Sequence, residues 1–126
     1  MFRLFIILLV IPTICFSQTQ EKQLTEKDVD NLILCIESDN DGIRSWGGFF
    51  AGKYQVKETV IPLLRILHDD ENVAIRKLAV HSLFRIGDNR GIFAIKGSAK
   101  YDKSEEVRNL CLSMVQSLDF MLLQNE

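Results

Sequence analysis

The chain has 126 residues, of which 15 are Lys or Arg and 17 are Asp or Glu, and 47% are hydrophobic. This length suits one domain, and the ordinary charged fraction excludes a disordered chain. A net charge of −2, with two His and three Cys, argues against a dedicated nucleic-acid binder, a disulfide scaffold and a structural zinc site.

Residues 1–17 have the pattern of a secretory signal peptide. Arg3 precedes the unbroken apolar run 4–11, and small residues stand at positions −3 and −1 of a cleavage site after residue 17. The apolar stretch is too short to cross a hydrocarbon core of about 30 Å, so no membrane span is expected. We expect export to the periplasm or the medium, with residues 18–24 as a flexible lead-in. Lipidation of Cys15 is a disfavoured alternative, because a bulky residue stands where a lipoprotein signal needs a small one.

From residue 25 onward, apolar residues recur with helical spacing, and no segment alternates with a period of two. Thr25 and Asp28 resemble a capping box that opens the first helix. Either Asn40 or Asp41 can cap the second. The chain is therefore predicted to be all-α.

The later helices have recognisable ends. Thr59 is expected to cap a third helix, with Pro62 in its first turn. Gly87 stands where the fourth helix needs a C-cap. A shorter fifth helix is predicted over about 92–99, and Ser104 opens the last.

The sequence repeats itself with a period of 32 residues. Arginines in the first turn of alternate helices share this spacing: Arg44, Arg76 and Arg108. Small residues follow in the same register: Gly47, Ala79 and Cys111. This period predicts three helical hairpins that bury their apolar faces by stacking, with the small residues allowing close approach.

The middle repeat resembles a HEAT repeat of the short, phycobilisome-lyase-like kind. The resemblance rests on an early proline, an acidic loop, an Ile-Arg opening and an Ile-Gly-Asp ending, in the segments 60–67 (VIPLLRIL), 69–79 (DDENVAIRKLA) and 83–88 (LFRIGD). It implies that residues 25–126 form an α-solenoid of about three hairpins, with repeats near 28–58, 59–90 and 91–123. It also implies a protein-binding role without catalysis.

The resemblance gives the three arginines a structural role. In such repeats the equivalent Arg commonly pairs with loop acids of its own or a neighbouring repeat, and the available acids are Asp39, Asp70 and Asp102. An anion-binding ladder along one edge is the alternative.

Two segments imitate ligand-binding motifs. Residues 47–53 fit the GxxxxGK of a phosphate loop, but no strand precedes them and Tyr54 replaces the hydroxyl residue that coordinates magnesium. Residues 37–42 imitate half of a calcium loop, but Gly48 stands where a bidentate Glu belongs. We expect no metal and no cofactor.

The sequence favours a non-enzymatic protein-interaction module whose partner is another protein. GxSxG, HExxH and paired CxxC motifs are absent. The alternatives are an accessory or lyase-type subunit of an enzyme system and a weak calcium-binding domain. Cys35 and Cys111 belong to different repeats and are predicted to be two buried free thiols.

A binding face is predicted on the second helix of each repeat. Counting 100° per residue places Lys77 and Phe84 almost opposite the apolar stripe of the fourth helix, with His81 alongside. Phe49 occupies the same face one repeat earlier. The competing interpretation is that Phe84 packs on a neighbouring repeat.

Overall fold

The structure is a computed structural model that describes residues 23–124 of the chain. These residues contain six α-helices and one 3-10 turn, joined by short loops. The helices are α1 (Glu26–Ile36), α2 (Asp41–Lys53), α3 (Val60–Asp69), α4 (Val73–Ile86), α5 (Asn89–Tyr101) and α6 (Glu105–Leu123). No strand occurs within that range, so the all-α prediction is confirmed there. The predicted signal peptide at 1–17, Cys15 and the lead-in up to residue 22 lie outside the described residues. None of the described helices is long and apolar enough to cross a membrane.

Several helix ends match the caps that the sequence predicts. The Thr25 hydroxyl accepts from the Asp28 backbone N–H at 3.2 Å, and the Asp28 carboxylate accepts from the Thr25 N–H at 2.9 Å. Asn40, rather than Asp41, caps α2 by accepting from the Ile43 N–H at 3.0 Å. Gly87 ends α4 in the left-handed region, at φ 70°.

Thr59 does not cap α3, contrary to prediction. Its backbone is already helical because the 3-10 turn Lys57–Thr59 leads directly into α3. Its hydroxyl instead donates to the Val56 carbonyl at 2.7 Å, which satisfies this buried group locally.

The fifth helix is longer than predicted, and the proposed repeat boundary at residue 91 falls inside it. Asp88 caps α5 by accepting from the Arg90 backbone N–H at 2.9 Å, which starts the helix at Asn89. Side-chain hydrogen bonds from Arg90, reinforced by its backbone N–H, lower the pKa of Asp88 to about 2. The cap therefore stays ionised at neutral pH.

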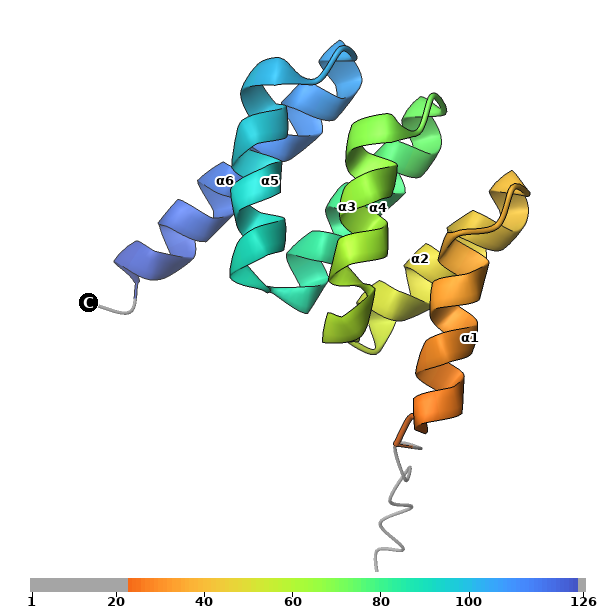
Figure 1. The fold of residues 1–126 in the computed structure, drawn as a ribbon. Coiled ribbons are helices and arrows are strands. Elements are labelled where there is room, and N and C mark those ends of the chain that lie inside the picture. The colour runs from red at the N-terminus through yellow and green to blue at the C-terminus, as the bar shows by residue number, and fades with distance from the viewer. Residues whose placement is uncertain (1–22, 125–126) are drawn as a thin grey trace, which may run out of the picture.

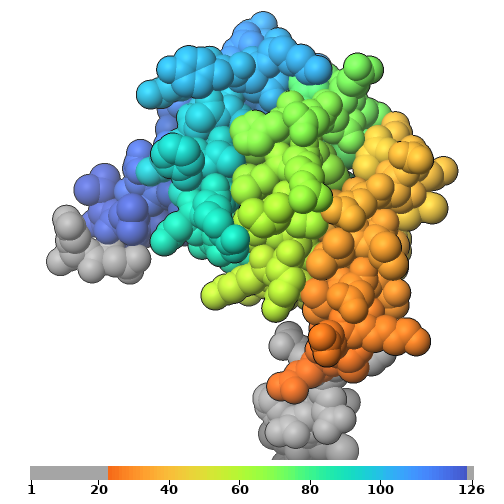
Figure 2. Space-filling model, viewed as in Figure 1, coloured from red at the N-terminus to blue at the C-terminus, as the bar shows by residue number. Residues whose placement is uncertain are grey.

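Consecutive helices pack as pairs: α1 on α2, α3 on α4, and α5 on α6. Figure 1 shows α1, α3 and α5 in a near layer, with α2, α4 and α6 behind them. In the space-filling view, α1, α3 and α5 lie side by side, with the first and third pairs at opposite ends (Figure 2). The second pair occupies the middle, where α4 contacts α2, α3, α5 and α6.

The core is densest around this central pair. Its fully or almost fully buried side chains include Val60, Leu63, Ile75, Ala79, Val80, Leu83, Ile95 and Val107. These apolar residues supply most of the driving force for folding.

The glycine-rich α2 is a continuous, closely packed helix. A Cβ added to Gly47 would lie 2.8 Å from the Cys35 Cβ on α1, and one on Gly52 would lie 2.8 Å from the Ser82 Cα on α4. The Ser82 hydroxyl donates to the Gly48 carbonyl at 2.7 Å. The glycines let α2 approach both neighbours, so their low helix propensity is offset by packing.

Candidate functional site

The three arginines of the 32-residue register make one hydrogen bond in common. Each donates from Nη1 to the backbone carbonyl six residues earlier: Arg44 to Ser38 (2.9 Å), Arg76 to Asp70 (2.8 Å) and Arg108 to Asp102 (2.7 Å). Each of these bonds connects the first turn of the second helix of a pair to the loop that precedes it. The loop carbonyl that accepts the bond has no partner within a helix. The shared geometry explains why arginine recurs at this spacing.

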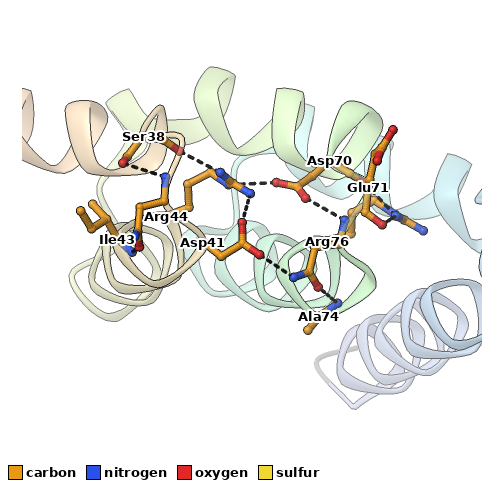
Figure 3. A network of polar contacts seen from close by, with 10 residues as sticks. Ser38, Asp41, Ile43, Arg44, Asp70, Glu71, Ala74 and Arg76 are labelled. Carbon is orange, nitrogen blue, oxygen red and sulfur yellow. Dashed lines mark hydrogen bonds and ion pairs between the residues drawn. The ribbon is translucent and has the colours of Figure 1, made fainter.

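Two of the arginines also reach a carboxylate on the next pair. Arg44 Nε lies 3.0 Å from Asp70 Oδ2, and Nη2 lies 2.6 Å from Asp41 on its own helix (Figure 3). Arg76 binds Asp102 through Nε at 3.2 Å and Nη2 at 3.0 Å. We call these contacts between successive pairs the arginine ladder. It uses Asp70 and Asp102 but not Asp39, which lies exposed.

The ladder ends at Arg108. Its side chain is half-buried and bonds the Asp102 carbonyl, but no carboxylate within residues 23–124 pairs with it. Within the described residues α6 is the last helix, so no later helical pair there supplies one.

An open groove of about 840 Å³ lies beside the first ladder contact. Glu37, Asp39, Asp41, Asp69 and Glu71 are among the residues that line it. Two of these carboxylates are already engaged by side chains: Glu37 by Arg65 at 2.8 Å, and Asp41 by Arg44 and Asn72.

The imitation calcium loop lies along this groove. Across the described part of the chain, no group of three or more His, Cys, Asp or Glu side chains is arranged to hold a metal ion. Asp41 faces the Arg44 guanidinium, and Asn40 turns inward to cap α2. Of the three carboxylates in this motif, Glu37 and Asp41 are therefore directed at cations and an amide of the protein itself, and Asp39 alone is exposed without an ion pair among the described residues.

The residues predicted to form a binding face occupy different environments. Phe49 is 48% exposed and packs edge-on against Phe50, with ring centroids 5.2 Å apart. His81 is exposed, whereas the Lys77 ammonium pairs with Glu106 on α6 at 2.9 Å. Phe84 is half-buried and packs against the core, so it does not face away from the core as the angle count indicated.

Sequence analysis missed an aromatic cluster on α2. The Trp46 and Phe50 centroids are 4.6 Å apart, and Tyr54 stacks on Phe50 at 5.9 Å. The Lys53 ammonium lies over the Phe50 and Tyr54 rings, 5.5 and 5.4 Å from their centroids. These aromatics follow i, i+4 spacing, which predicts core packing, yet Trp46 is 53% exposed, and among the described helices only α1 borders this side of α2.

The remaining motif and the thiols have structural positions. Residues 47–53, which fit the phosphate-loop pattern, lie inside α2, where backbone amides belong to helical hydrogen bonds. Both described cysteines are free, as predicted, and Cys111 is buried, but Cys35 is only half-buried, contrary to the prediction that both thiols are buried. Burial, with a smaller contribution from the Asp102 charge, raises the pKa of Cys111 to about 11. This thiol is therefore unsuited to act as a nucleophile at neutral pH.

No model of a known protein family matches the sequence, and no curated protein matches it.

Proposed function

We propose that the chain is a small exported α-solenoid of three HEAT-like hairpins that binds another protein and catalyses no reaction. The observation that carries this proposal is the arginine ladder, in which Arg44 reaches Asp70 and Arg76 reaches Asp102 at the same 32-residue interval. A contact that repeats from pair to pair is typical of stacked repeats, since each unit interacts only with its neighbours.

The surface available for a partner lies on the second helices. Phe49 and His81 are exposed on α2 and α4, and Lys77 adds a cation held by Glu106. Aromatic side chains next to cations are effective interface anchors. The partner surface expected from this composition is apolar where it meets Phe49, and polar where it meets His81 and the Lys77–Glu106 pair.

A site-specific photocrosslinker tests this surface. We would place it at His81 in the full chain expressed in its own host, with a matched control at Ile61, which is exposed on α3 in the other helix layer. The proposal expects one adduct of defined mass from position 81, absent from position 61 and lost with Phe49→Glu. Equal crosslinking at both positions, or none at position 81, would contradict a binding face on the second helices.

Export is tested separately by the mass of the purified chain. Cleavage after Ser17 gives a protein that begins at Gln18. An uncleaved chain in the cytosol would overturn the export proposal, and a diacylated chain beginning at Cys15 would identify a lipoprotein instead.

A further inference from the structure

At the two ends of the row of helical pairs, side chains are exposed at positions whose equivalents within the row contact a neighbouring pair. At the junction between the first and second pairs, Leu78 and Ser82 of α4 pack against Gly48 and Gly52 of α2. The positions equivalent to Leu78 and Ser82 in the first pair, 32 residues earlier, hold Trp46 and Phe50. Trp46 is 53% exposed there, because no other helical pair among residues 23–124 covers it.

The opposite end repeats this situation on α6. The positions equivalent to Gly48 and Gly52 in the third pair are Leu112 and Gln116. Leu112 is 48% exposed, and Arg108 beside it has no carboxylate partner among the described residues. In stacked-repeat proteins a terminal unit normally has a polar outer face that protects the end from solvent. The first pair lacks such a face, and on the third pair the exposed Leu112 interrupts a face that is otherwise polar at Asn109 and Gln116.

The charges at the two ends are complementary. Leu64 and His68 of α3 line a groove with Phe93, Ala94 and Gly97 of α5. The positions equivalent to Leu64 and His68 on α5 hold Lys96 and Lys100, so the third pair presents cations to whatever follows it. On α1 the position equivalent to Ala94 is Asp30, which is exposed.

The first pair also offers a carboxylate near the ladder. Ser38 occupies the position of Asp70 and Asp102, and the next residue, Asp39, is exposed with no ion pair in the described range. An acid at this place is what the half-buried Arg108 of another copy lacks.

We propose that a second copy of this chain continues the row head to tail. The exposed side of the first pair around Trp46 (the Trp46 face) in one copy covers the exposed side of the third pair around Leu112 (the Leu112 face) in its neighbour. Asp39 of the one copy takes the position of the missing ladder acid beside Arg108 of the neighbour. Asp30 of the one copy faces Lys96 and Lys100 of the neighbour. This inference rests on the stacked-repeat arrangement proposed above. Because the two faces differ, the contact is heterologous, and association is open-ended and grows with concentration.

Two variants, each changing one of the two faces, test the head-to-tail assembly. Trp46→Glu disables the first face and Leu112→Glu the second, and each is exposed, so the fold should tolerate both. We expect residues 18–126 to exceed the dimer mass at high concentration in sedimentation velocity, and each variant alone to be monomeric. An equimolar mixture has one intact face of each kind and should form a dimer that grows no further.

A control variant and the contrary outcomes complete the experiment. Ile61→Glu, an exposed apolar site on the middle pair, should assemble like the unmodified chain. Arg108→Asp should weaken association at least tenfold and remove part of its salt dependence.

A monomeric unmodified chain, or a mixture of variants that stays monomeric, would overturn the inference. Dimers of Leu112→Glu alone would show pairing through identical Trp46 faces instead. If the chain is monomeric but Arg76 and Asp102 remain energetically coupled, the assembly fails while the stacking proposal stands.

Discussion

The Arg76 guanidinium is 1% exposed, yet its charge is well satisfied. Two of its nitrogens bind the Asp102 carboxylate, and Nη1 donates to the Asp70 and Glu71 carbonyls at 2.8 and 3.2 Å. Asp102 is also almost buried, at 6% exposure. Removing either partner therefore leaves a desolvated charge with only neutral partners, which are the Ser104 N–H at 2.8 Å for Asp102 and the two carbonyls for Arg76.

Arg76→Ala should destabilise the protein by about 3–5 kcal/mol, since it leaves Asp102 buried and unpaired. Arg108→Ala, the matched change at the open end of the ladder, removes only a hydrogen bond to a carbonyl and should cost about 1 kcal/mol. Urea denaturation of residues 18–126 measures both. Equal losses would show that the carboxylate contact adds nothing to the carbonyl bond.

A double-mutant cycle isolates the pair itself. If Arg76 and Asp102 act together, the variant carrying both alanines should be more stable than the sum of the single losses indicates, by about 1–3 kcal/mol. Additive losses would mean that the two side chains stabilise the fold independently.

Cys111 should resist alkylation until the protein unfolds. Its pKa is raised from 9.0 to about 11 by burial, so the folded state holds the thiol proton more tightly than the unfolded state. The corresponding stability is fully present below pH 9 and is lost as the pH rises toward 11. Iodoacetamide labelling followed by mass spectrometry should modify the half-buried Cys35 first at pH 8. Faster labelling of Cys111 would contradict its burial.

At the scale of elements, the packing of α2 depends on missing side chains. Gly52→Ala gains about 1 kcal/mol of helix propensity, but its Cβ would meet the Ser82 backbone on α4 at 2.8 Å. Separating two helices in a close-packed interior costs about 1–3 kcal/mol, so the net effect should be destabilising.

Gly97→Ala is the control for this prediction. It lies within α5, and a Cβ there would meet nothing within 4 Å, so it should stabilise the protein by about 0.5–1 kcal/mol. Thermal melts of the two variants should shift in opposite directions. A stabilising Gly52→Ala would show that α2 and α4 can separate without loss.

The elements were largely predictable because their signals are local. Periodicity indicated every helix, and the Thr25–Asp28 box and Gly87 marked ends through bonds between residues close in sequence. The prediction that Thr59 caps α3 was wrong because the preceding 3-10 turn competes for its hydroxyl. The extent of α5 was missed because the Asp88 cap precedes its apolar residues.

The candidate site was less predictable because it depends on contacts between pairs. The resemblance predicted that the arginines pair with loop acids such as Asp70 and Asp102, but it left open whether the acid belongs to the same or a neighbouring repeat. In the structure Asp70 and Asp102 both lie on the pair that follows their arginine. Angle counting describes a lone helix, and Phe84 sits in a helix that neighbours surround. The exposure of Trp46 likewise follows from its place at an end of the row, which periodicity does not reveal.

At the scale of the whole molecule, stability should fall from the centre toward both ends. The central α4 packs against four other helices, whereas the outer side of the first pair and the last turns of α6 are open. In an array held together by neighbour contacts, the ends can open without disrupting the middle, and the reverse is not possible.

Native-state hydrogen exchange at low protein concentration should reveal this gradient. We expect amides of α4 to exchange only through global unfolding, and those of α1 and of residues 117–123 in α6 to exchange through smaller openings. Arg76→Ala should lower the protection of α4 by the same free energy that urea denaturation measures, because opening α4 requires breaking its contacts with both neighbouring pairs. Equal protection of α1 and α4 would instead show that the three pairs unfold as a single unit, and neighbour contacts alone could not then account for the stability of the row.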